Sequence, residues 1–426
     1  MRFIHAADVH LDSPLLGLDS YEGAPVEAIR RATRSALQKL VDLAIAEHVA
    51  LILLAGDLYD GDWRDANTGL FFIAQMSRVD QLGIPVVLVS GNHDAASRIT
   101  GRLVYPKNVH ILPVEEAGTI RFESRRIAVH GQGYARQAED RNLVANYPLP
   151  VPGYFNIGLL HTALDGREGH EPYAPCSLSE MTAKGYDYWA LGHVHRRESV
   201  NGSNQPRVEY PGNLQGRHIR ETGPKGCLLV TISSDGRSHP DFRALDVFRW
   251  ELLPVDVSGL NSTVEVVDAV AAAFSDLLSS ASGQALGVRV ELTGATSLHE
   301  ALEAESGRLT DELRSCAVAE SAGRLWVEKV LLRTSRETAS LESEMGLAED
   351  AMAEIGSVIA QLRADSQMIA TLLKQGECGD LLKKLPPEFR LGPDGQDPTG
   401  PEALADYLAR AECILGAAVT RAETGR

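Results

Sequence analysis

Short apolar runs alternate with longer helical patterns through the first 245 residues of the chain. The runs are rich in β-branched residues and are bounded by glycine, aspartate or asparagine, which is typical of β-strands. Two helical stretches, Val26–Glu47 and Asp65–Gln81, separate the first three runs, as expected of βαβ units in a parallel or mixed sheet. The predicted strands are Phe3–Ala7, Val49–Ala55, Pro85–Ser90, Ile127–His130, Asn156–Leu160, Tyr188–Leu191, Val208–Tyr210, Cys227–Ile232 and a segment near Phe242.

The pattern changes after residue 245, and we predict three parts: residues 1–245, a smaller α/β unit over 246–335, and a helical region over 336–426. The predicted elements of the middle part are the strands Arg249–Val257, Ala285–Leu292 and Leu325–Leu332 and the helical segments Ser262–Ser279 and Ser297–Ala319.

The last part carries a coiled-coil-like seam. From Met345 to Leu373 apolar residues recur at alternating spacings of three and four, which indicates an amphipathic helix. A Pro/Gly-rich loop, Pro386–Pro401, precedes a predicted final helix over Glu402–Thr420. A seam of this length either packs within the chain or docks a partner helix.

The charge of the chain is acidic and uneven. Its 426 residues hold 41 Lys+Arg and 58 Asp+Glu, a net charge of −17. Residues 1–245 account for 25 basic and 28 acidic side chains, and residues 246–426 for 16 and 30, so the net charges are −3 and −14. This is not the usual electrostatic signature of a nucleic-acid-binding protein, so a polyanionic substrate would need bound cations or local basic patches.

The five cysteines are scattered and never form a CxxC pair. This argues against a disulfide framework or a thiolate zinc site and favours a reducing compartment. No apolar run approaches the roughly 20 residues that span a bilayer, and the first residues are typical of a strand rather than a signal peptide. We therefore expect a cytoplasmic protein without a membrane partner.

Polar residues suited to metal binding follow five of the predicted strands. Because functional groups in open α/β sheets gather at the carboxyl ends of strands, these side chains are expected at one rim. Each motif alone has an ordinary explanation, such as a turn or a satisfied core histidine, but their joint order favours a metal site. The candidate ligands are Asp8, His10, Asp57, Asn92, His161, His193 and His195.

Seven ligands exceed what one ion with open positions requires, so two metals sharing a carboxylate are predicted. Asp57 is the natural bridge, since an imidazole ordinarily binds one ion. The nitrogen and oxygen donors suit manganese, iron or zinc. Two such cations would lower the pKa of a water and neutralise a phosphate. His93, next to Asn92, is the candidate catalytic residue, placed to protonate the departing oxygen or to stabilise the transition state.

These motifs, DVH (8–10), GDLYD (56–60), GNHD (91–94), His161 and GHVH (192–195), resemble those of the calcineurin-like metallophosphoesterase superfamily. The resemblance implies an α/β (α+β) fold, a four-layer β-sandwich flanked by helices, with the site at its rim. It also implies that Asp8, His10, Asp57 and His195 hold one metal and that Asp57, Asn92, His161 and His193 hold the other. His93 takes the family's transition-state role.

Within the superfamily the chain resembles the bacterial DNA-repair exonuclease branch, SbcD-like and especially YhaO-like proteins. The supporting stretches are FIHAADVHLDSPL, YPGNLQGRHIRE (210–221) and WVEKVLLR. This resemblance implies two Mn²⁺ ions, hydrolysis of DNA phosphodiesters by exonuclease or endonuclease action, and a capping role for residues 246–335. It further implies a homodimer and an SMC-like coiled-coil ATPase as partner, with the C-terminal helices as the docking element.

Two positions depart from related patterns. Asp60 stands where the better-known double-strand-break nucleases often carry a second site histidine, which puts phosphate stabilisation from that side in doubt. Gly61 stands where protein serine/threonine phosphatases carry an arginine, which counts against that activity.

Basic residues near the ligand motifs are candidates for contacts to DNA phosphates, although each is equally well explained as a solvated surface residue. They are Arg196, Arg197, Arg217, His218 and Arg220. Two alternatives to a nuclease stay open: a small-molecule phosphodiesterase, for instance for cyclic nucleotides, and a non-catalytic scaffold that keeps the fold.

Overall fold

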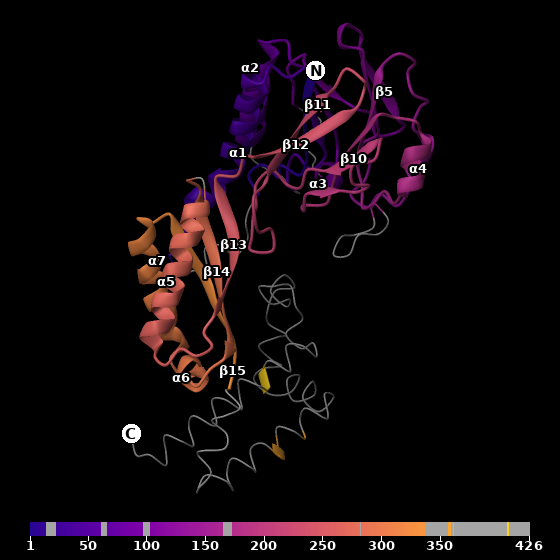
Figure 1. The fold of residues 1–426 in the computed structure, drawn as a ribbon. Coiled ribbons are helices and arrows are strands. Elements are labelled where there is room, and N and C mark those ends of the chain that lie inside the picture. Colours follow the sequence, from indigo (N-terminus) through magenta and orange to yellow (C-terminus); the bar gives the residue numbers. More distant parts are fainter. Residues whose placement is uncertain are drawn as a thin grey trace, which may run out of the picture. The chain divides into compact units, whose positions relative to one another are not determined.

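A computed structural model of the chain describes residues 1–13, 23–60, 66–96, 103–164, 173–281 and 283–336, with a few isolated positions beyond (Figure 1). It divides into two compact units, Met1–Glu251 with Gln284–Gly287, and Leu252–Gly283 with Val288–Arg426. Apart from those isolated positions, the predicted seam over 345–373, the loop over 386–401 and the final helix lie outside the described residues.

Two six-stranded sheets form the first unit. The first sheet has the order β12 (Ser238–Ala244), β11 (Gly226–Ile232), β1 (Arg2–Ala6), β2 (Ile52–Ala55), β3 (Val86–Val89) and β4 (Val109–Ile111). The second has the order β5 (Gly118–Phe122), β6 (Ile127–Gly131), β7 (Phe155–His161), β8 (Tyr188–Gly192), β10 (Arg207–Tyr210) and β9 (Glu198–Ser199). Strands β1 to β4 are parallel, as are β6, β7, β8 and β10, so each sheet has a parallel centre.

Residue alternation in the strands separates the cores of this unit. In β1, Phe3 faces the second sheet, whereas Ile4 packs under the helices. The core between the sheets includes Phe3, Leu51, Leu53, Val87, Val89, Ile127, Val129, Ile157, Leu159 and Tyr188.

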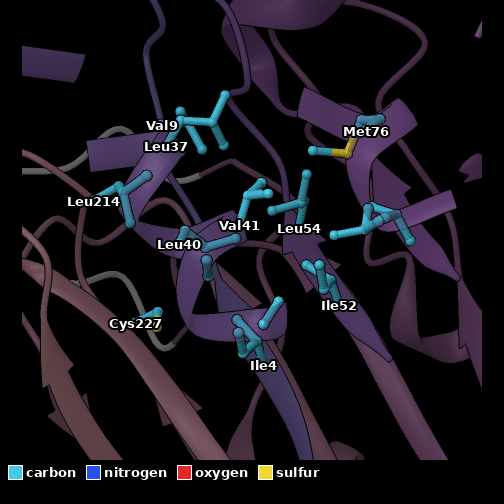
Figure 2. Close-up of a cluster of buried hydrophobic side chains, with 14 of the residues drawn as sticks. Ile4, Val9, Leu37, Leu40, Val41, Ile52, Leu54, Met76, Leu214 and Cys227 are labelled. Carbon is cyan, nitrogen blue, oxygen red and sulfur yellow. The ribbon is translucent and has the colours of Figure 1, made fainter. Parts of the chain in front are cut away.

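Helices α1 (Val26–Ala46) and α2 (Ala66–Asp80) cover the outer face of the first sheet. Figure 2 shows Leu37, Leu40 and Val41 of α1 against strand residues such as Ile52 and Leu54. On the outer face of the second sheet, Trp189 packs with Met181 of α4 (Leu178–Ala183) and with Tyr147. Helix, sheet, sheet and an outer layer with α4 make four layers, which confirms the predicted fold.

A three-stranded sheet has the order β13 (Phe248–Asp256), β14 (Ala285–Ala295) and β15 (Leu325–Ser335). Apart from the first residues of β13 and β14, it belongs to the second unit. Helices α5 (Thr263–Ser280) and α7 (Ser306–Ser321) lie side by side along it (Figure 1). The predicted helical segment 297–319 is two helices, α6 (His299–Ala304) and α7, because the backbone at Glu305 leaves the helical region (φ −112°, ψ 22°). No helix among the described residues combines the length and the apolarity needed to cross a membrane.

The sequence did not predict several short elements. Strands β4, β5 and β9 lie toward the sheet edges and are only partly buried, so they carry a weak apolar pattern. The other unpredicted elements are α3 (Asn92–Ala96), α4 and two 3₁₀ turns, Glu123–Arg125 and Val144–Asn146.

One polar side chain joins the two sheets inside their common core. His5 is fully buried, with Nε2 3.0 Å from the carbonyl oxygen of Leu191 and Nδ1 3.0 Å from the hydroxyl of Tyr188. Since a carbonyl can only accept, Nε2–H donates to Leu191, and Nδ1 accepts from Tyr188. Burial lowers the pKa of His5 to about 3, so the folded protein keeps this imidazole neutral.

We predict that His5 makes the first unit sensitive to acid. Its pKa of about 3 in the fold lies below the ordinary histidine value of 6.5, so the stability that the neutral ring contributes is present above pH 6.5 and is lost as pH falls toward 3. Between pH 6.5 and 5 the loss amounts to about 2 kcal/mol. Urea unfolding with EDTA present, compared between the native chain and His5→Gln, measures this difference. An equal loss of stability in both proteins over that range would contradict the assignment.

Candidate metal centre

Five strands deliver polar side chains to one rim of the sandwich. Asp8 and His10 follow β1, Asp57 follows β2, and Asn92 and His93 open α3 directly after β3. From the second sheet, His161 is the last residue of β7, and His193 and His195 follow β8. The structure therefore brings all seven candidate ligands and His93 together, four ligands from one sheet and three from the other.

The first cluster in this centre is formed by Asp8, His10 and His195, which can offer ligand atoms within 4.8 Å of one another. Nε2 of His10 lies 3.2 Å from Nε2 of His195. The backbone N–H of His193 donates to both carboxylate oxygens of Asp8, at 3.1 Å each. Asp8 is thereby oriented from the β8 side.

The second cluster surrounds His161. Its Nε2 lies 3.0 Å from Oδ1 of Asn92, 3.2 Å from Nδ1 of His193 and 3.4 Å from Oδ2 of Asp57. Its Nδ1 lies 2.9 Å from the carbonyl oxygen of Ala55, so in the neutral ring Nδ1 carries the proton and Nε2 is a bare acceptor.

A bare acceptor facing two oxygen acceptors is unfavourable without a positive charge between them. Carboxylate, amide and imidazole donors together suit a divalent metal ion. The residues of both clusters therefore fit the metal ions that the motifs imply.

Asp57 lies between the two clusters. Its Oδ2 is 3.8 Å from Nε2 of His10 and 3.4 Å from Nε2 of His161. Its other oxygen accepts a hydrogen bond from the backbone N–H of His93 at 2.9 Å. Asp57 is therefore within reach of ligands in both clusters.

The electrostatics of the centre favour cations. Burial raises the pKa of Asp8 to about 6 and lowers the pKa of His10 to about 3. Burial also opposes the charges of Asp57 and His161, but their mutual attraction holds the pKa of Asp57 well below its usual range and raises the pKa of His161 to about 9. Two carboxylates in a dry pocket require positive charge, which His161 supplies in the absence of metal.

The backbone is strained at the ligands. Asp8, His10, Asp57 and His193 all have positive φ, at 50°, 43°, 49° and 100°. Side chains other than glycine rarely adopt this region, and such strain persists only where the surrounding structure enforces it. The tightly packed strands on either side provide that enforcement.

The glycines before three ligands have two different purposes. Only Gly56 has positive φ, at 89°, which allows a sharp turn. Gly91 and Gly192 are needed for space: a Cβ would lie 2.2 Å from Oδ1 of Asp57 at Gly91 and 1.9 Å from the carbonyl oxygen of Ala55 at Gly192.

His93 is paired with Asp60, the residue that departs from the nuclease pattern. Nδ1 of His93 lies 2.7 Å from Oδ1 of Asp60, while Ser13 donates to the other oxygen of Asp60 at 2.5 Å. Burial opposes the charge on His93, yet the hydrogen bond to Asp60 raises the pKa of His93 above its usual value. The His93 side chain is 33% exposed, whereas most of the ligands are buried. His93 is therefore both oriented and accessible.

Sequence reasoning missed two supporting carboxylates. Asp94 accepts backbone N–H groups from Leu58, Tyr59 and Gly91 at 3.1, 2.9 and 3.1 Å, and so joins the loops after β2 and β3. Glu221 lies 2.7 Å from Nδ1 of His195. Asp94 stands inside the GNHD motif and Glu221 ends the stretch YPGNLQGRHIRE, but the sequence assigned neither of them a role.

The candidate phosphate contacts differ in exposure. The Arg217 side chain is only 13% exposed and pairs with Asp60 and Glu221. Arg196, Arg197, His218 and Arg220 are exposed, and Arg197 lies over the ring of Phe242 at 4.4 Å.

Sequence profiles of two families match the chain. Calcineurin-like phosphoesterase matches residues 1–197, and the middle domain of metallophosphoesterase YhaO matches residues 250–335. The chain is 39% identical over 318 residues to the "Uncharacterized metallophosphoesterase YhaO" of Bacillus subtilis (strain 168), which covers 74% of this chain and 77% of that protein.

More distant similarity extends to proteins named for DNA repair. "DNA double-strand break repair protein Mre11" of Methanopyrus kandleri is 27% identical over 61% of this chain and 60% of its own length. The Mre11 protein of Sulfurisphaera tokodaii is 26% identical over 55% of this chain and 60% of its own length. Among solved structures, a dimetal phosphatase from Danio rerio aligns with 57% of this chain and 96% of its own at 13% identity, with a TM-score of 0.36.

The matched region 1–197 contains all five motifs whose side chains meet at the rim. The YhaO relative extends the similarity over about three quarters of both chains. The chain belongs to the calcineurin-like metallophosphoesterase family.

Proposed function

We propose that this metal-dependent phosphoesterase is a phosphodiesterase that cleaves DNA, as an exonuclease or endonuclease, and that it uses two Mn²⁺ ions. The observation that carries the proposal is the meeting of seven candidate nitrogen and oxygen ligands, Asp57 among them, with the partly exposed His93 beside them. The printed names of the Mre11 relatives support DNA as the substrate.

The protein's own groups divide the work. Two divalent cations, when bound, supply the positive charge that activates a water and neutralises phosphate oxygens. Asp60 accepts a hydrogen bond from Nδ1–H of His93. Nε2 is therefore the nitrogen of His93 that can exchange a proton with the departing oxygen. The strained backbone at the ligands holds them in place before substrate arrives.

DNA binding has to overcome the acidity of the chain. Arg196 and Arg197 directly follow His195, and Arg220 directly precedes Glu221. All three are exposed, and each can bind a backbone phosphate. A net charge of −17 repels a polyanion such as DNA more strongly than a molecule with a single phosphodiester. The charge of the chain therefore favours the alternative substrate, a small phosphodiester such as a cyclic nucleotide. The proposal therefore depends on a direct comparison of the two substrates.

Partners and location complete the proposal. The resemblance to SbcD-like and YhaO-like proteins supports a homodimer and an SMC-like coiled-coil ATPase partner. Among the described residues, Cys176, Cys227 and Cys316 are free thiols, which is compatible with the reducing cytoplasm.

The substrate test uses purified protein with Mn²⁺ on end-labelled linear duplex DNA and on bis(p-nitrophenyl) phosphate. We expect both to be hydrolysed, with release of nucleotides or fragments from DNA. Turnover of the small ester alone would replace the nuclease with the small-molecule phosphodiesterase, and turnover of neither would favour a scaffold.

We predict that Asp57→Ala loses both metal ions, whereas His10→Ala weakens mainly one. Asp57 lies between the clusters, and His10 faces only one of them. Elemental analysis after dialysis against Mn²⁺ measures the stoichiometry. His130→Ala is the control, because His130 is equally buried but bonds to Thr119 and Asn156 instead. Two ions retained by Asp57→Ala would remove the bridge.

We predict that His93→Ala lowers kcat by about 10²- to 10⁴-fold, the usual worth of a positioned acid or base. Asp60→Asn should lower kcat less, because the His93 ring stays but its orientation is weakened. Both variants should keep two bound ions, and the control His48→Ala, at an exposed position after α1, should keep full activity. An unchanged kcat in His93→Ala would show that catalysis does not use this residue.

A further inference from the structure

A second set of polar residues lies behind the metal ligands, on the loop that joins β10 to β11. Backbone hydrogen bonds tie this loop to the ligand loops: the N–H of Asn213 donates to the carbonyl oxygen of His195, and the N–H of Leu214 donates to that of Asp8, both at 3.4 Å. Glu221, toward the end of the loop, is 5% exposed. A buried carboxylate at this depth needs partners that compensate for its lost hydration.

Those partners include one metal ligand. Oε1 of Glu221 lies 2.7 Å from Nδ1 of His195, and Oε2 accepts from Nδ2 of Asn213 at 2.9 Å and from the backbone N–H of Arg217 at 2.7 Å. Oε1 of Glu221 also accepts from Nη2 of Arg217 at 3.2 Å, so both oxygens act as acceptors of N–H groups. Nδ1 of His195 therefore carries the proton that points to Glu221, and its Nε2, 3.2 Å from Nε2 of His10, keeps a lone pair for a metal ion.

Arg217 connects this carboxylate to the other side of the site. Nη2 of Arg217 donates to Glu221 at 3.2 Å, and Nη1 donates to Oδ2 of Asp60 at 3.3 Å. Asp60 in turn pairs with His93 at 2.7 Å. A continuous chain of hydrogen bonds therefore runs from His195 through Glu221, Arg217 and Asp60 to His93.

We propose that Glu221 and Arg217 are positioning residues of the metal centre: Glu221 fixes the tautomer and orientation of His195, and Arg217 links Glu221 to the Asp60–His93 pair. The inference rests on the proposed function and adds to it two residues that touch neither metal nor substrate. A carboxylate behind a metal-binding histidine is typically worth 10- to 100-fold in metal affinity or activity. The guanidinium of Arg217 pairs with Asp60 and with Glu221, so one cation compensates two carboxylates.

The first test measures Mn²⁺ binding without substrate. Apo protein is titrated with Mn²⁺, and the loss of the free-ion EPR signal gives the number and affinity of the sites. Glu221→Gln should weaken one of the two sites by about 10- to 100-fold and leave the other near the native value. The matched control is Glu209→Gln, which removes an equally buried carboxylate paired with Arg207, on β10 rather than at the metal centre.

The second test separates positioning from phosphate binding by Arg217. With bis(p-nitrophenyl) phosphate as substrate, Arg217→Met should lower kcat by about 10-fold or more and leave KM nearly unchanged, because the side chain is 13% exposed and locked between carboxylates. Arg217→Lys should recover part of kcat, since it restores the charge but not the two-armed geometry. A rise in KM with an unchanged kcat would instead assign Arg217 to the substrate and overturn its positioning role.

Separate outcomes distinguish this inference from the proposed function. If the native chain binds no Mn²⁺, the metal centre itself fails. If the native chain binds two ions and Glu221→Gln binds both as tightly as Glu209→Gln, only the positioning role is overturned. Should Glu221→Gln not fold, Glu221→Asp keeps the charge but withdraws it by one methylene, and the same selective loss is expected. Native-like binding by Glu221→Asp would then overturn the role.

Discussion

The arrangement of the rim depends on hydrogen-bond acceptors that face one another with too few protons between them. Nε2 of His161 faces amide and carboxylate oxygens, and Nε2 of His10 faces Nε2 of His195. The contacts of His161 are repulsive while its Nε2 carries no proton, and they become attractive around a cation. The centre is therefore built for bound metal, and its apo form must store unfavourable electrostatic energy or recruit protons, as His161 does.

The rest of the first unit sustains this unfavourable arrangement. Strands with fully buried apolar faces end directly at the ligands, so the loops that follow have little freedom to relax. Asp94 fixes two of these loops through three backbone N–H groups, and positive φ angles persist at Asp8 and Asp57. The same four-layer packing that stabilises the fold thus keeps a costly set of groups close together.

Sequence reasoning brought the seven candidate ligands to one rim because each lies at the end of a strongly apolar strand or within four residues of that end. Asp57 and His193 needed only the rule that parallel strands end at a common rim. Glu221 could not be found in this way, because its partner His195 is 26 residues earlier and no spacing rule connects them. The need for glycine at Gly91 and Gly192 was likewise invisible, since it arises from neighbours on other strands. The sequence marks Asp60 as a departure from the nuclease pattern, but its contact with His93 is visible only in the fold.

The candidate ligands are divided between the two sheets, so their spacing depends on how the sheets pack against each other. Asp8, His10, Asp57 and Asn92 belong to one sheet, and His161, His193 and His195 to the other. The apolar core between the sheets therefore sets the distance between the two groups of ligands. This core includes Leu53 and Val87 from the first sheet and Ile157 and Leu159 from the second. A change of side-chain volume in this core, such as Val87→Leu, would strain that spacing although Val87 is not itself a ligand.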